Sequence, residues 1–120
     1  MLCLTAAGLA LSLPITAFTL AWEHTVERTE WQEDYRISSA GLILSEARIR
    51  GHGAGMEPGE NARLEGGWWR WRPDRAPVPE LILARSGVGE WRLCWAAAGC
   101  NELAVLLPGM APVTMRPCED

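Results

Sequence analysis

The sequence predicts an all-β fold: a single-domain antiparallel β-sandwich or partly open barrel over residues 1–120, built of short strands with at most one short helical turn. Three observations predict this class. Apolar and polar residues alternate along several short runs, no long stretch keeps a helical period, and glycine and proline recur between the runs. Alternation with a period of two is typical of strands with one buried face, and regular Gly/Pro punctuation is typical of sandwiches and barrels.

Length and composition agree with one folded domain. The chain has 120 residues, of which 48% are apolar and 22% are charged, so it can bury a core and is not a generally disordered chain. The net charge of −4 and the lack of a long arginine cluster argue against a nucleic-acid-binding surface. We therefore expect no nucleic-acid partner, and composition leaves the oligomeric state undefined.

Glu23 is the first charged residue, so the opening segment before it is uncharged. We predict the first strand in this segment. The alternative is a targeting or membrane-anchoring segment, since such segments also contain a long uncharged and apolar stretch. A signal peptide carries a basic residue near its start, which this segment lacks, and a spanning helix would have to include Gly8 and Pro14. We therefore predict one strand over residues 2–14, a corner at Pro14, and a second strand starting near Phe18.

The second and third runs are predicted to form a hairpin with two polar residues on its buried face. Even positions from 18 to 26 and odd positions from 31 to 37 are mostly apolar, so each set lies on one strand face. His24 and Glu33 belong to these sets. A turn at residues 28–29 would bring the two faces together, and a longer loop is equally compatible with the pattern.

That register makes a specific prediction about the polar pair. Trp22 would lie opposite Tyr35, and His24 would lie opposite Glu33. A buried polar group without a partner costs about 1–3 kcal/mol, so we expect a hydrogen bond between His24 and Glu33 and no metal site.

A further strand over residues 41–50 is predicted to place Ile43, Ala47 and Ile49 on one face. The glycine loop that follows contains Gly51, Gly53, Gly55 and Met56. It leads into a proline and a turn, whereas a phosphate-binding loop leads into a helix. We therefore predict a tight corner or bulge with at least one glycine at positive φ.

Residues 68–72 are predicted to form a strand with tryptophan on both faces. Trp69 and Trp71 point one way, and Trp68, Arg70 and Arg72 point the other way. The second set would form cation–π pairs or present a ligand or protein interface, with Trp68 as the exposed tryptophan. Further strands are predicted near residues 80–86, 90–95 and 112–118, with a proline-rich loop over 73–79 and one helical turn within 101–107.

Four cysteines allow three disulfide connectivities, and their spacing favours one of them. Cys94 and Cys100 flank a hairpin-sized interval, while Cys3 and Cys118 stand near the two ends of the chain. These two bridges would indicate an oxidising compartment; the alternative is four reduced thiols in the cytoplasm. No CxxC pair occurs and there are only two histidines, so we predict no zinc site and no cofactor.

Several motifs occur in an order that resembles a known family. They are the box His24-Thr25-Val26-Glu27, the carboxylate of Glu33 and the loop Gly53-Ala54-Gly55-Met56. The chain resembles the bacterial family called domain of unknown function 1850, with Thr25 in place of the family's serine. This resemblance implies association with tripartite (TRAP-type) solute transporters that use an extracytoplasmic binding protein. It implies no established enzymatic activity.

The functional prediction is a non-enzymatic accessory or interaction domain of such a transport system. Its partners would be membrane transporter components or the solute-binding protein. It would lie outside the cytoplasm, in the periplasm or at the membrane, with a cytoplasmic location as the alternative. The alternative function is a small-molecule or ion-binding module that uses His24, Glu27 and Glu33. A hydrolase is the weakest interpretation, because Thr25 would point away from His24 on a strand.

Overall fold

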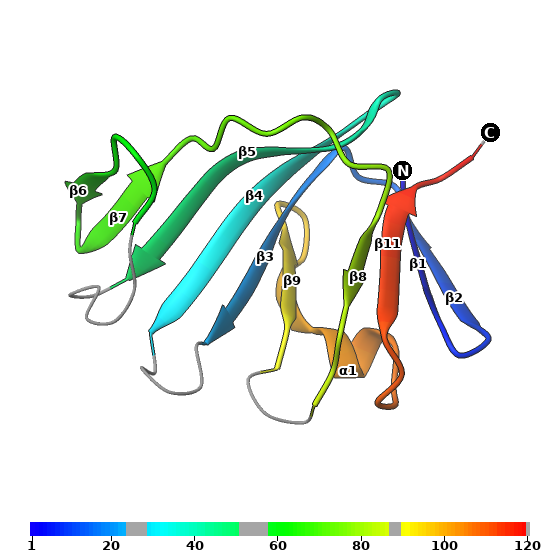
Figure 1. The fold of residues 1–120 in the computed structure, drawn as a ribbon. Coiled ribbons are helices and arrows are strands. Elements are labelled where there is room, and N and C mark those ends of the chain that lie inside the picture. The colour runs from blue at the N-terminus through cyan, green and yellow to red at the C-terminus, as the bar shows by residue number, and fades with distance from the viewer. Residues whose placement is uncertain (24–28, 51–57, 87–89, 120) are drawn as a thin grey trace.

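The computed structural model describes residues 1–23, 29–50, 58–86 and 90–119. In these residues the chain forms two packed antiparallel sheets and one helical turn (Figure 1). One sheet has four strands in the order β2-β1-β11-β8, and the other has seven strands in the order β10-β9-β3-β4-β5-β7-β6. Both sheets are open. The predicted all-β class is therefore confirmed as a sandwich rather than a barrel.

The bounds of the elements are as follows. The four-stranded sheet contains β1 (Leu2–Ala6), β2 (Leu9–Leu13), β8 (Leu81–Leu83) and β11 (Val113–Pro117). The seven-stranded sheet contains β3 (Ala17–Glu23), β4 (Glu30–Ser38), β5 (Gly41–Arg50), β6 (Arg63–Glu65), β7 (Trp68–Trp71), β9 (Arg92–Trp95) and β10 (Gly99–Glu102). The helical turn α1 (Leu103–Leu106) follows β10, inside the stretch where one was predicted.

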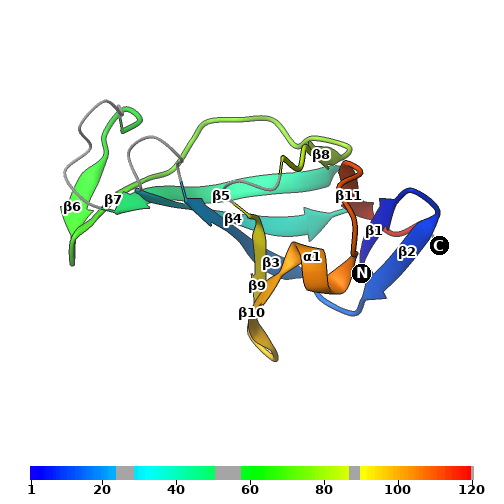
Figure 2. The same ribbon diagram turned by 90° about the horizontal axis from the view of Figure 1, so that it is seen from below.

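The hydrophobic core lies between the two sheets. Leu4 of β1 and Met115 of β11 are fully buried, and they belong to one apolar cluster with Leu20 of β3 and Leu93 of β9. Figure 2 shows that the four-stranded sheet lies toward one end of the larger sheet, with β6 and β7 at the opposite end. The larger sheet therefore extends beyond the smaller one on the side of β7.

The opening segment forms a hairpin, so the prediction of one strand over residues 2–14 is wrong. β1 and β2 pair up to Ala6 and Leu9, which leaves Ala7 and Gly8 as a two-residue turn. Their φ values are 45° and 85°, the positive values that a type I′ turn needs at both central positions. The apolar residues switch from even positions in β1 to odd positions in β2, and this switch is the sequence signal of the turn.

Replacing Ala7 with asparagine is expected to stabilise the protein by about 0.5–1 kcal/mol, because asparagine tolerates positive φ better than alanine and Asn-Gly is favoured in type I′ turns. Urea unfolding measures the change. Ala10→Asn, in the middle of β2, is the control and should bring no gain, because asparagine is disfavoured in strands. A gain of the same size in both variants would contradict a turn-specific effect.

The β3–β4 hairpin has a different register from the predicted one. Trp22 pairs with Trp31 rather than with Tyr35, and Tyr35 pairs with Phe18. The rings of Phe18 and Tyr35 are stacked with centroids 5.3 Å apart. A shift by an even number of residues keeps every side chain on its predicted face, so alternation alone does not select the register. In the observed register, aromatic rings of the two strands pack against each other.

A bulge in β5 changes which of its residues face the core. Tyr35 pairs with Leu44 and Asp34 pairs with Glu46, so Ser45 is an extra residue between them. The bulge places Leu44 on the same face as Ala47, and both are buried. Ile43 therefore lies on the opposite face, and the predicted grouping of Ile43 with Ala47 and Ile49 is wrong.

Candidate functional site

Polar side chains form a continuous network on the outer face of the seven-stranded sheet, the face turned away from the core. Strand pairing aligns one row of polar residues across this face, interrupted only by Ala21 of β3: Arg92, Gln32, Arg48, Arg70 and Arg63. Arg48 lies next to Arg70, and Arg70 lies next to Arg63. Like charges directly opposite each other destabilise a sheet, so this row needs neighbouring carboxylates.

Arg48 is the centre of the network. Its guanidinium donates to both carboxylate oxygens of Asp34, at 2.8 and 3.0 Å, and to Glu46 Oε1 at 3.0 Å. Its Nε donates to Gln32 Oε1 at 2.7 Å. Only 13% of the Arg48 side chain is exposed. A bidentate, largely buried pair of this kind is among the stronger ion pairs on a protein surface.

The network continues to both sides of Arg48. Arg70 donates to Glu46 at 2.7 Å on the side of β7. On the other side, Glu30 accepts from Gln32 and from Arg92, each at 2.6 Å. The outer face is therefore tied together by side chains from β9 to β7.

The network lowers the pKa of two carboxylates. Burial raises the pKa of Asp34, but hydrogen bonds from Arg48 and Thr19 and the Arg48 charge outweigh it, so the pKa lies below its ordinary value. Burial likewise raises the pKa of Glu30, and hydrogen bonds from Arg92 and Gln32 bring it below its ordinary value. Both groups are therefore negatively charged at neutral pH.

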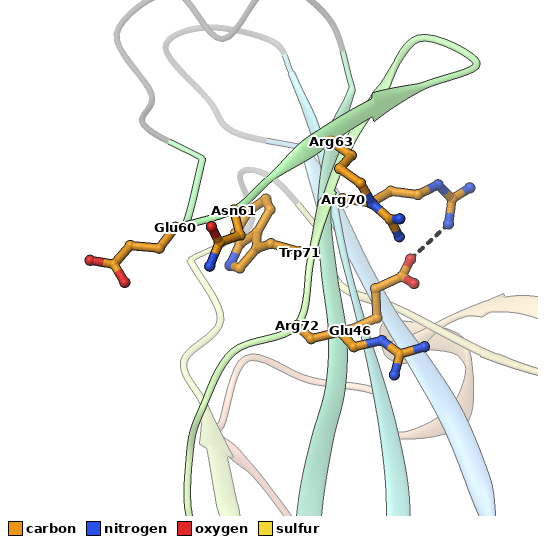
Figure 3. Close-up of a pocket in the computed structure, with 7 residues that line it drawn as sticks. All are labelled: Glu46, Glu60, Asn61, Arg63, Arg70, Trp71 and Arg72. Atoms are coloured by element: carbon orange, nitrogen blue, oxygen red, sulfur yellow. Dashed lines mark hydrogen bonds and ion pairs between the residues drawn. The ribbon is translucent and has the colours of Figure 1, made fainter.

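A pocket of about 400 Å³ opens at the β7 end of this face (Figure 3). It is lined by Glu46, Glu60, Asn61, Arg63, Arg70, Trp71 and Arg72. Figure 3 shows the guanidinium groups of Arg63, Arg70 and Arg72 on the same side of β7 as Glu46.

The arginines of this pocket differ in how far they are neutralised. Arg70 is bound to Glu46, whereas Arg63 lies 3.7 Å from Glu65 with 76% of its side chain exposed. Arg72 is also exposed, and among the described residues it has no ion-pair partner. The pocket can therefore attract a carboxylate from outside the chain.

Four tryptophans lie in a row on the opposite face, the one that continues the core. Ring centroids are 4.9 Å apart for Trp91 and Trp22, 6.0 Å for Trp22 and Trp31, and 6.3 Å for Trp31 and Trp71. All four side chains are partly exposed. Trp91 Nε1 donates to the carbonyl of Ala84 at 2.8 Å, whereas the buried Nε1 of Trp31 has no hydrogen-bond partner among the described residues. Trp22 and Trp91 pack against the core, whereas Trp71 belongs to β7, at the end of the larger sheet that extends past the smaller one.

Most of the predicted polar cluster lies outside the described residues. This applies to His24, Thr25 and Glu27, and to the glycine loop with Gly51, Gly53, Gly55 and Met56. Their predicted roles stay predictions.

The structure does describe Glu33, and the position of this residue shows that the predicted register is wrong. It lies opposite Leu20 rather than opposite His24, and its Oε1 accepts a hydrogen bond of 2.9 Å from the hydroxyl of Tyr35. Burial raises the pKa of Tyr35, and the charge of Glu33 raises it further. The hydroxyl of Tyr35 thus supplies a hydrogen-bond partner for a carboxylate on the apolar face.

Trp68 and Arg70 lie on the outer face, as their positions in the sequence indicate. The cation–π partner of Trp68 is Arg50, with the guanidinium carbon 5.6 Å from the ring centroid, and not Arg70 or Arg72. Arg50 lies directly opposite Trp68 across β5 and β7. Sequence reasoning missed Arg48 and Arg50; the signal was present as alternating charged residues in the two strands that pair as β4 and β5.

Both predicted disulfides are confirmed. Cys3 is bonded to Cys118, which ties β1 to the residue that follows β11, and Cys94 is bonded to Cys100, which ties β9 to β10. Such bridges are compatible with a location outside the cytoplasm. In the part of the chain that the structure describes, no helix has the length and apolar character needed to cross a membrane.

Two packed open sheets, each with one disulfide of its own, define a disulfide-bridged β-sandwich domain. The chain matches the family model called domain of unknown function (DUF1850) over residues 18–101. Because the match covers more than half of the chain, this protein belongs to the DUF1850 family. Comparison with curated proteins and with solved structures gave no significant match.

Proposed function

We propose that this protein is a non-enzymatic accessory or interaction domain of a tripartite (TRAP-type) membrane solute-transport system and acts outside the cytoplasm. Membership of the DUF1850 family supports the association with transport, which is what the resemblance to that family implies. The two disulfides support the location, since such bridges form and persist in oxidising compartments. Its partners would be the solute-binding protein or the membrane components.

The proposed interaction role rests on one surface at the β7 end of the outer face, which we call the Trp68 surface. It is formed by Arg50, Arg63, Trp68, Arg70 and Arg72. Trp68 is half-buried rather than fully exposed as predicted, and the guanidinium of Arg50 lies over its ring, which restricts the ring before binding. Arg63 and Arg72 are exposed beside it. Tryptophan and arginine are enriched among the residues that dominate binding energy at protein interfaces.

The charges of this surface indicate the chemistry of the partner. Arg70 is paired with Glu46, whereas Arg63 is exposed at 3.7 Å from Glu65, and Arg72 has no ion-pair partner among the described residues. A partner that presents acidic side chains around an apolar patch would pair with these guanidinium groups and cover the Trp68 ring. We therefore propose an acidic protein surface as the occupant.

Deleting this protein from its source cell is expected to reduce uptake of labelled solutes carried by tripartite transporters, and the wild-type chain should restore it. A Trp68→Ala, Arg72→Glu variant should restore it poorly, because losing interface residues of this kind weakens binding about tenfold or more. Arg116→Glu is the matched control, since Arg116 is an exposed arginine of the other sheet. Co-purification with the solute-binding protein should follow the same order.

Several results would contradict this function. Normal uptake in the deletion strain would remove the link to transport. Equal restoration by the two variants, with unchanged thermal melting of both, would place the interface elsewhere. Native protein found in the cytosol with four thiols that react with an alkylating reagent would contradict the proposed location.

A further inference from the structure

Strand β2 lies at a free edge of the four-stranded sheet, and in the described part of the chain no strand pairs with its outer side (Figure 1). In a hairpin closed by a two-residue turn, the flanking residues exchange both backbone hydrogen bonds, and the bonded positions then alternate. Leu9, Leu11 and Leu13 therefore bond to β1. Ala10 and Ser12 direct their N–H and C=O groups to the free edge, and both residues are exposed.

This edge lacks the features that normally prevent edge-to-edge pairing. Its sequence, Leu-Ala-Leu-Ser-Leu, contains no charge and no proline, and its pairing with β1 shows no bulge. Of the other edge strands in the described chain, β6 is Arg-Leu-Glu, β10 ends in a glutamate, and β8 has three residues. Among these edge strands, β2 is therefore the longest, and it contains no charged residue.

The leucines of β2 also leave apolar surface uncovered. Leu9, Leu11 and Leu13 pair with Ala6, Leu4 and Leu2, so they lie on the core-facing side of the sheet. Leu9 is nevertheless 45% exposed, and Leu11 and Leu13 are partly exposed. Figure 2 shows β2 at the margin of the molecule with no element beyond it. A strand added at this edge would cover part of this apolar strip.

We propose that β2 pairs antiparallel with β2 of a second copy of this chain, around a two-fold axis at Leu11. This register places Ala10 opposite Ser12 and Leu9 opposite Leu13. The outward-facing groups of Ala10 and Ser12 then form four backbone hydrogen bonds, and six leucines form one strip on the core side. Only the residue on the two-fold axis, Leu11, meets its own symmetry mate, so a charge at this position would meet an identical charge and repel it. The absence of charge in β2 makes the strand electrostatically compatible with its own copy.

Sedimentation of the disulfide-bonded protein over a range of concentrations tests the association. A dimer is expected, and Leu11→Lys should weaken it at least about tenfold, because two like charges would meet at the axis. Leu64→Lys is the matched control, since Leu64 is 57% exposed in the edge strand β6. Circular dichroism and melting of both variants show whether each is folded.

Cysteine cross-linking tests the register. Residues at position 11 would form a non-hydrogen-bonded pair with Cα atoms about 4.5 Å apart, within the range a disulfide needs. Leu11→Cys should therefore give a covalent dimer on mild oxidation, whereas Ala10→Cys, which faces Ser12 of the other copy, should not. A monomer at every concentration would overturn the proposal. So would a dimer unaffected by Leu11→Lys, or equal cross-linking of the two cysteine variants.

Discussion

Replacing Cys3 and Cys118 together by alanine is expected to lower the free energy of unfolding by about 4–5 kcal/mol, as the chain-entropy model predicts for so long a loop. The bridge joins residues 115 positions apart, so it greatly restricts the unfolded chain. Urea unfolding of the oxidised wild type and of the variant measures the loss. A loss of this size is a large part of the stability of an ordinary domain.

The second disulfide provides the control for this prediction. Cys94 and Cys100 are only 6 positions apart. Their replacement should cost about 2 kcal/mol by the same model, because a shorter loop restricts the unfolded chain less. Equal losses for the two pairs would show that local packing around the sulfur atoms, rather than loop closure, determines their contribution.

Arg48→Met is expected to lower the free energy of unfolding by about 2–3 kcal/mol at neutral pH, because it removes charge-assisted hydrogen bonds from a largely buried network. Asp34 and Glu46 lie directly opposite each other across β4 and β5 and would be left as like charges without their shared cation. Methionine keeps the apolar stem of the side chain, so the variant tests the charge and its hydrogen bonds. Urea unfolding at constant salt is the measurement.

The pH dependence of the Arg48→Met effect gives a second readout. The folded-state pKa of Asp34 lies below its ordinary value of 3.8. Its contribution to stability is therefore present above pH 3.8 and is lost as the pH falls through the lower, folded-state pKa. The difference between wild type and Arg48→Met should shrink over this acid range. Arg36→Met, at an exposed arginine of the same face, should change stability by less than about 0.5 kcal/mol at any pH. A similar loss in that control would contradict a specific role of the network.

The candidate site could be predicted only in part. The assignment of Trp68 and Arg70 to one face follows from alternation along a single strand, which is a local property. The stacking of Arg50 on Trp68 could not be predicted in the same way, because it depends on which residue of β5 lies opposite Trp68. The hydrogen bonds of Arg48 also depend on how the strands pair. Its four acceptor atoms belong to residues of β4 and β5 that only one particular register brings together.

The sequence by itself determined the all-β class, the face on which most strand residues lie, and the two disulfides. The class, the strand faces and the Cys94–Cys100 bridge depend on residue type and short-range spacing, which remain unchanged when strands slide past one another by an even number of residues. The Cys3–Cys118 bridge is the pairing that remains once Cys94 and Cys100 are paired. Tertiary structure decided the Trp22–Trp31 register and the Ser45 bulge. It also decided that Glu33 lies opposite Leu20 and accepts a hydrogen bond from Tyr35. Each of these choices depends on how side chains pack and hydrogen-bond across paired strands, and alternation along a single strand does not define that.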